Sequence, residues 1–239
     1  MKNLLYPKLF FATMRIFHPK HDKIDKFNII ISNLIRALVI IAAFGAILTQ
    51  RWFVFFICIL AILFTYLPDL VRKNYEFYIP PEFEIIMVIF IYFSLILGEV
   101  HGYYETFWWW DSFLHAGSGL ALGVIGFLLL LMLYDEKKIN ASPIILVIFS
   151  FCFALALGGL WEIFEFSMDQ LIGSNMQKSG LVDTMWDLIV DALGAFVASA
   201  LGWLYLKGGQ PCFINRIVYK FVVKNPKLFG KLKLKRMKC

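Results

Sequence analysis

Three aspartates follow one another at helical spacing in the segment DTMWDLIVDALGA, residues 183–195. Residues at i, i+4 and i+8 share one face of a helix, so Asp183, Asp187 and Asp191 form an acidic stripe in an otherwise apolar segment. An aspartate at the centre of a membrane helix costs about 2.5–3.5 kcal/mol on insertion scales, so the stripe must be offset by water, protons or a cation. We expect Asp187 and Asp191 to be functional. Asp183 is expected to cap the helix start, where a carboxylate suits the exposed amides.

Two further segments carry residues that can bind a cation or transfer a proton. In DSFLH, Asp111 and His115 lie one helical turn apart, which suits two metal ligands or an acid–base pair, although such a helical pair serves structural roles equally often. In WEIFEFSMD, Glu162 and Glu165 lie one turn apart within an apolar segment, and we interpret both as functional. Asp169 follows at the end of the same segment, where water can solvate it.

Oxygen-rich sites suit Mg²⁺, Mn²⁺ or Ca²⁺, and an imidazole also admits Zn²⁺. The sequence therefore predicts a divalent metal site. Its predicted ligands are Asp111, His115, Glu162, Asp187 and Asp191. The predicted catalytic acid–base residues are Glu165 and His115, with Glu165 as the general base that activates a metal-bound water.

The elements that carry these residues are predicted to be transmembrane helices. The chain has 239 residues, of which 60% are hydrophobic and 17% charged, and its apolar residues occur in blocks near the length that crosses a bilayer. We expect an all-α polytopic membrane protein with about six spans, at residues 28–49, 52–69, 85–101, 111–134, 144–168 and 183–206. These spans form one domain, 28–206, between a basic interfacial N-terminus, 1–27, and a basic tail, 207–239.

Basic residues predict the orientation of the spans. With both termini in the cytoplasm, 20 of the 23 Lys and Arg residues lie on the cytoplasmic side; the others are Arg36, Arg51 and Lys178. This N-in/C-in arrangement places the acidic and histidine residues toward the extracytoplasmic side. Arg36, inside the first span and away from the acidic site, is expected to snorkel, with a role as a counter-ion as the alternative. We also expect no acids in the cytoplasmic half of the spans, and no Lys or Arg as partner to the acidic site.

The net charge of +6 belongs to the cytoplasmic rim in this arrangement, so it does not predict nucleic-acid binding. The tail 211–239 mixes Lys with Phe, Val and Leu. It is interpreted as a plain topology determinant or as a segment that binds anionic lipid head groups. The run from Phe107 to Trp110 is expected to be an aromatic belt at the outer interface or, because it directly precedes Asp111, a surface on which a substrate stacks. Glycines such as Gly119, Gly158 and Gly194 are expected to let the helices approach closely.

The segments WWWDSFLHAGSGLALG, GGLWEIFEFSMD and DTMWDLIVDALGA together resemble the YjdF-like family of bacterial inner-membrane proteins, whose function is unknown. The resemblance covers roughly residues 85–206 and implies a location in the bacterial inner membrane. The order of the motifs is also similar, more distantly, to the VanZ-like proteins, which implies a role at the cell envelope. Asp191 stands where the VanZ-like pattern more often has Asn, and Trp161–Glu162 fits the YjdF-like pattern better.

Three functions are consistent with these residues. The first is a metal-assisted hydrolase or transferase that acts on a lipid or envelope-precursor head group. The second is a proton- or cation-coupled transporter, for which the sequence has no visible internal repeat. The third is a non-catalytic membrane factor whose polar layer fixes helix packing or docks a partner.

Overall fold

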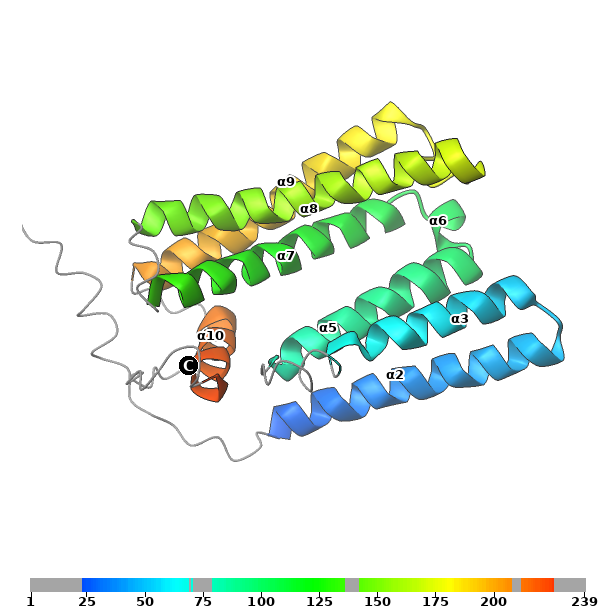
Figure 1. Ribbon diagram of the computed structural model, residues 1–239, viewed down its shortest axis with the longest axis horizontal. Helices are drawn as coiled ribbons and strands as arrows, with labels where there is room; N and C mark the ends of the chain where they lie inside the picture. Colours follow the sequence, from blue (N-terminus) through cyan, green and yellow to red (C-terminus); the bar gives the residue numbers. More distant parts are fainter. Residues whose placement is uncertain (1–22, 69, 71–78, 136–141, 208–211, 226–239) are drawn as a thin grey trace, which may run out of the picture. The chain divides into compact units, whose positions relative to one another are not determined.

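The computed structural model describes residues 23–68, 70, 79–135, 142–207 and 212–225, and every regular element in these ranges is a helix (Figure 1). The chain forms two compact units. Unit 1 contains the chain as far as Trp110 together with the end of the last helix, from Tyr219 on, and unit 2 contains Asp111–Val218. Residues 1–22 of the predicted N-terminal segment and 226–239 of the predicted tail lie outside the described residues.

Among the described residues, five helices are long and apolar enough to span a membrane: Phe27–Leu48, Glu82–Val100, Trp110–Leu131, Pro143–Leu171 and Leu181–Leu206. The predicted span 52–69 forms a shorter apolar helix, Trp52–Thr65. Its 14 residues extend for about 21 Å, less than a bilayer core of about 30 Å. The proline at position 68, which cannot donate a backbone hydrogen bond, lies just beyond its end. The all-α, multi-span membrane fold is confirmed, and the N-in/C-in orientation stays a prediction.

Unit 1 is built on apolar helices that pack side by side (Figure 1). They are α2 (Lys23–Leu48), α3 (Trp52–Thr65) and α5 (Pro81–Ile91), which continues as the π-helix η1 (Tyr92–Val100) and is followed by α6 (Tyr103–Thr106). Their core consists of small and branched apolar side chains: Val39, Ala43, Ile57, Cys58, Ala61, Ile91 and Ile96. Small residues at the contact let these helices pack closely.

Arg36 is a buried residue of this core, so the prediction that it snorkels was wrong. Its guanidinium donates to Oε1 of Glu84 at 3.2 Å and to the backbone oxygen of Thr65 at 2.5 Å. It also lies over the ring of Tyr66. Since Thr65 ends α3, Arg36 of α2 ties the end of α3 to the first turn of α5.

Glu82 lies in the same first turn of α5 and makes a second buried ion pair. Its partner is Lys220 of α10 (Cys212–Lys224), whose ammonium lies 2.5 Å from Oε1 of Glu82. Two buried glutamates therefore begin α5, just before the predicted span 85–101. Lys220 is also a buried residue, not one of the tail lysines that can face lipid head groups.

Trp110 does not behave like the other residues of the predicted aromatic belt, because its side chain is buried. Trp108 is 89% exposed, as a belt residue would be, whereas Trp110 is buried. The ring of Trp110 packs against Tyr103 and Phe93, with centroid distances of 5.0 and 5.4 Å. Trp110 is therefore a core residue, and only the exposed members of the run are candidates for a belt.

Unit 2 consists mainly of three long helices side by side (Figure 1): α7 (Trp110–Asp135), α8 (Pro143–Ile172) and α9 (Leu181–Leu206). Helix α9 shows which kinds of side chain these helices bury and which they expose. Its exposed side chains are large and apolar, including Trp186, Ile189, Leu193 and Phe196. Its buried residues are small or polar: Asp187, Asp191, Gly194, Ala195, Ala198, Ser199, Gly202 and Tyr205. This pattern is the inverse of that in a soluble helix, and it points the acids into the protein and the apolar side chains toward lipid.

Glycines fix the spacing of these helices where a larger side chain would clash. A Cβ on Gly194 of α9 would meet the backbone of Ala116 and Leu120 in α7, and one on Gly119 of α7 would meet the backbone of Asp191. Gly158 of α8 faces the carboxylate of Asp191, whereas nothing lies within 4 Å of a Cβ at Gly159. Close helix packing, as the glycine pattern predicts, therefore occurs at the level of the acidic residues.

Candidate functional site

The candidate site lies within unit 2, where the beginnings of α7 and α9 meet the last turns of α8. Asp111 is in the first turn of α7 and His115 follows one turn later. The Nε2 atom of His115 lies 3.8 Å from Oδ1 of Asp111. His115 is buried, so the pair that the DSFLH motif predicts points into the helix bundle.

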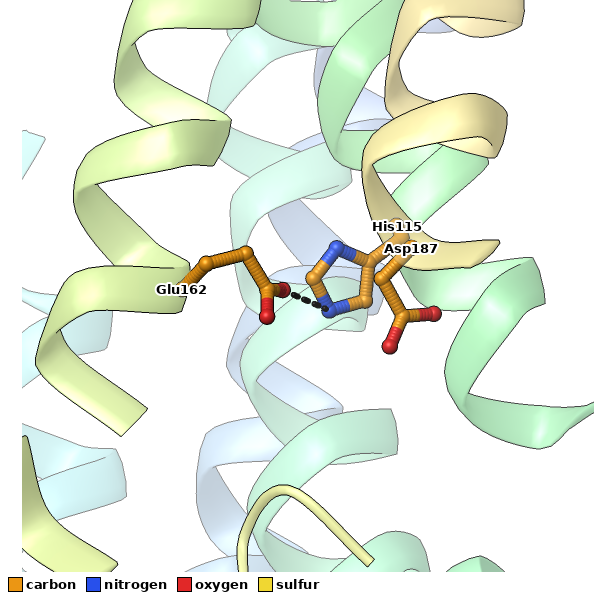
Figure 2. Close-up of side chains that lie close together, drawn as sticks. All are labelled: His115, Glu162 and Asp187. Carbon is orange, nitrogen blue, oxygen red and sulfur yellow. Dashed lines mark ion pairs between the residues drawn. The ribbon is translucent and has the colours of Figure 1, made fainter. Parts of the chain in front are cut away.

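Figure 2 shows the His115 ring between two carboxylates from different helices, Glu162 of α8 and Asp187 of α9. Nε2 of His115 lies 3.8 Å from Oε1 of Glu162. One ligand atom from each of the three residues lies within 4.8 Å of the others. All three residues are buried, and the structure thus brings together side chains that are far apart in the sequence.

The carboxylates of Glu162 and Asp187 have buried oxygens that lack hydrogen bonds from the described residues. Both oxygens of Glu162 and Oδ2 of Asp187 are shielded from solvent and accept no hydrogen bond from a described residue. The Thr184 hydroxyl interacts with Glu162, without the geometry of a hydrogen bond. An unsatisfied buried polar group costs about 1–3 kcal/mol and a charged one costs more. A cation or a proton between these residues would offset that cost.

Asp191 contacts the opposite edge of the His115 ring. Its Oδ2 lies 3.3 Å from Nδ1 of His115. Its Oδ1 lies 3.1 Å from the hydroxyl of Ser118, which is also 2.8 Å from the backbone oxygen of His115. A hydrogen on Nδ1 donated to Asp191 leaves the Nε2 lone pair directed at Glu162 and Asp111. Metal-binding histidines commonly have this arrangement, in which a carboxylate orients the ring from its far side.

Asp183 joins the site in a way that the sequence reasoning missed. The N-cap residue of α9 is Gly180, and no side chain in the described part of the chain caps this helix, so the predicted capping role of Asp183 was wrong. Asp183 instead forms a second group of possible ligands with Asp111 and Asp187, again with one atom of each within 4.8 Å. Its place in the i, i+4, i+8 stripe was the signal that could have identified it.

Lys178 also belongs to the site, contrary to the prediction that no lysine or arginine would be a partner. Its ammonium lies 3.5 Å from Oδ2 of Asp111. Lys178 is located in the loop between α8 and α9, which Asp169 holds in place. The Asp169 carboxylate accepts hydrogen bonds from the Ser174 hydroxyl and from the backbone amides of Met176 and Gln177, at 2.7–2.9 Å. Asp169 is therefore a loop anchor as well as a helix-end residue.

Glu165, the predicted general base, is buried one turn after Glu162. Its Oε1 accepts a hydrogen bond of 2.8 Å from the indole of Trp161. It belongs to neither group of possible ligands. The hydrogen bond fixes one carboxylate oxygen, and the role of Glu165 as a base stays a prediction.

Comparisons with known proteins give a family and one relative. An uncharacterized protein of Thermotoga maritima is 27% identical over 123 residues, which cover 52% of this chain and 62% of the relative. The chain therefore aligns with less than two thirds of that relative's length. No solved structure matches the chain. The model of a family described as "Predicted membrane protein (DUF2238)" matches residues 28–208, which include every candidate site residue, and the chain therefore belongs to this membrane-protein family.

Proposed function

We propose that this protein is a membrane-embedded, divalent-metal-dependent hydrolase or transferase that acts on the head group of a lipid or of an envelope precursor. The observation that carries the proposal is the His115–Glu162–Asp187 group, which combines ligand atoms within 4.8 Å of one another with buried carboxylate oxygens that lack hydrogen bonds. In this proposal His115, Glu162 and Asp187 hold the ion and Asp111 supports it from the preceding turn of α7. Mg²⁺, Mn²⁺, Ca²⁺ and Zn²⁺ are all compatible with this set of donors.

We assign Asp191 a positioning role, although its spacing predicts a ligand. It faces Nδ1 of His115, on the far side of the ring from Glu162. From there it fixes the ring and favours a free Nε2, while Ser118 fixes Asp191 in turn. Glu165 remains the candidate general base because it is close in sequence to Glu162 and one of its oxygens is already oriented by Trp161. A bound metal would supply Lewis acidity and a water of lowered pKa.

The proposed location is the bacterial inner membrane with the site toward the extracytoplasmic side. The distribution of basic residues supports this orientation, and the family match is compatible with the YjdF-like resemblance. The more distant VanZ-like resemblance is the reason for proposing an envelope head group as substrate. The remainder of the basic tail is proposed to bind anionic lipid head groups.

Elemental analysis and a product assay test the proposal together. The full-length protein, purified in detergent, should retain about one divalent ion per chain, and Glu162→Gln and Asp187→Asn should each remove it. Glu105→Gln is the matched control, because Glu105 is an exposed carboxylate outside the site. Vesicles that contain the protein and phospholipid should release or exchange head groups in a metal-dependent way, as measured by mass spectrometry. Wild-type protein without metal and without product under these conditions would rule the proposal out.

A transporter remains a second candidate because polar groups continue along the interior of unit 2. The Ser150 hydroxyl donates to the backbone oxygen of Gly123 at 2.7 Å, and the Ser199 hydroxyl lies 3.4 Å from that of Ser150. Both serines are buried. Ser150→Ala and Ser199→Ala should leave an enzyme active, whereas they should slow proton-coupled uptake into vesicles if these hydroxyls line a path.

A further inference from the structure

Asp187 belongs to both groups of possible ligands, with His115 and Glu162 in the first and with Asp111 and Asp183 in the second. We propose that the site binds two divalent cations and that Asp187 is their shared ligand. This inference rests on the proposed function, because the cation in the first group is the one proposed above. The second cation binds the Asp111–Asp183–Asp187 group.

The environment of Asp187 points to a ligand rather than to a solvated acidic cluster. Its side chain is 2% exposed, and its Oδ2 is buried without a hydrogen bond from a described residue. The two oxygens of one carboxylate can bind two different ions, which is how carboxylates bridge metals in many two-metal sites. Asp183 lies one turn before Asp187 on α9, and Asp111 comes from α7, so two helices supply the second group.

The two groups differ in chemistry and in exposure. The first contains an imidazole and is fully buried, whereas the second contains only carboxylate oxygens, and Asp111 and Asp183 are half-buried. Oxygen donors alone suit the hard cations Mg²⁺, Mn²⁺ and Ca²⁺. Because water can reach the second group, its cation should bind more weakly and exchange faster than the cation of the first group.

Lys178 competes for the second position. Its ammonium lies 3.5 Å from Oδ2 of Asp111, and its side chain is 27% exposed. A divalent cation bound to Asp111 repels this ammonium, so Lys178 must move away when the second cation binds. The released ammonium can then pair with an anionic group, such as a phosphate, on a substrate that bridges the cations. Cation binding and recognition of an anionic head group are thereby coupled through one lysine.

Titration with Mn²⁺ tests this inference on the full-length protein in detergent, after chelator treatment to remove bound metal. Binding is measured by equilibrium dialysis, and electron paramagnetic resonance detects magnetic coupling between adjacent Mn²⁺ ions. Wild-type protein should bind two ions with different affinities and give the spectrum of a coupled pair. Asp183→Asn should weaken the second ion by roughly tenfold or more and abolish the coupling, while the first ion remains. Lys178→Met should tighten the second ion several-fold, and Glu105→Gln should change neither.

Other outcomes contradict the inference at different levels. One bound ion in the wild type, unchanged by Asp183→Asn, overturns the two-cation site and leaves the proposed function in place. Two ions without magnetic coupling overturn the shared role of Asp187. Absence of any bound ion overturns both proposals. If Asp183→Asn fails to fold, Lys178→Met decides: a tighter second ion supports the inference, and an unchanged titration contradicts it.

Discussion

Buried charges are handled in opposite ways in the two units. In unit 1, each buried glutamate of α5 has a cationic partner: Glu84 pairs with Arg36, and Glu82 pairs with Lys220. In unit 2, six carboxylates gather around His115, and the described cation beside them is Lys178, which contacts Asp111. The six are Asp111, Glu162, Glu165, Asp183, Asp187 and Asp191. One unit balances its buried charges with its own side chains, and the other leaves a negative excess.

This difference separates a structural use of charge from a functional one. A matched ion pair inside a protein costs much desolvation energy but balances the charge of both partners, so it can hold helices in register without any ligand. An unmatched group of buried acids is costly until a proton or cation binds. The acids of unit 1 should therefore matter for folding, and those of unit 2 for binding.

The largest effect is expected at the Arg36–Glu84 pair. Arg36→Met removes the guanidinium that pairs with the buried carboxylate of Glu84, and breaking such a pair by removing one member costs about 3–5 kcal/mol. Thermal or denaturant unfolding in detergent should show this loss. The double variant Arg36→Met/Glu84→Leu should recover much of it, since no unpaired charge remains. Equal instability of the single and double variants would show that packing around Arg36, rather than charge pairing, stabilises unit 1.

In unit 2, removal of a buried carboxylate should raise the free energy of unfolding when no metal is bound, the opposite of the effect expected in unit 1. Glu162→Gln removes a buried charge that accepts no hydrogen bond from a described residue, so the metal-free variant should be more stable than the metal-free wild type. Mn²⁺ at 100 times its dissociation constant should stabilise the wild type by about 2.7 kcal/mol and the variant hardly at all. Melting curves with chelator and with Mn²⁺ measure both effects. A variant that is less stable than the wild type in chelator would place Glu162 among the structural acids.

A smaller effect is expected from Asp191, which touches the ring of His115 from its Nδ1 side. Asp191→Asn keeps the side-chain volume but changes the hydrogen bonding that orients the ring. Losing such an orienting partner costs about 10–100-fold in metal affinity. Titration should show that the number of bound ions is unchanged while the affinity of the first falls. Complete loss of the ion would instead make Asp191 a direct ligand, as its spacing in the sequence suggests.

Helical spacing predicted which residues share a face of one helix, and the alternating directions of the predicted spans placed Asp111, His115, Glu162 and Asp187 at the same level of the membrane. It did not predict the partners that come from loops or from other helices. Lys178 lies in the loop after α8, and its approach to Asp111 depends on the turn that Asp169 holds. No periodicity describes such a turn.

The same limit explains the errors in unit 1. The sequence predicts that an arginine in an apolar segment either snorkels or acts as a counter-ion, but it does not identify the acid with which the arginine would pair. The pairing of Arg36 with Glu84 depends on a residue 48 positions later.

The error at Asp183, in unit 2, has a local cause. The position of Asp183 near the start of α9 predicts a cap, but Gly180 precedes that helix with a positive φ of 64°. Glycine alone adopts this conformation easily, so the helix starts there without a side-chain cap.

The smallest effect is expected at two adjacent glycines of α8, and it tests whether the acidic site depends on exact helix spacing. A Cβ at Gly158 would meet the Asp191 carboxylate, whereas a Cβ at Gly159 has nothing within 4 Å. Replacing glycine by alanine stabilises a helix by roughly 0.5–1 kcal/mol through its helix propensity. This contribution is the same in Gly158→Ala and Gly159→Ala, so it cancels when the two variants are compared. Gly158→Ala should also displace Asp191 and thereby turn the ring of His115, which lowers metal affinity. Gly159→Ala should bind metal like the wild type. Isothermal titration calorimetry measures the metal affinity of both variants. Equal affinities would mean that Asp191 can shift without moving His115. The metal site would then depend on its ligands alone.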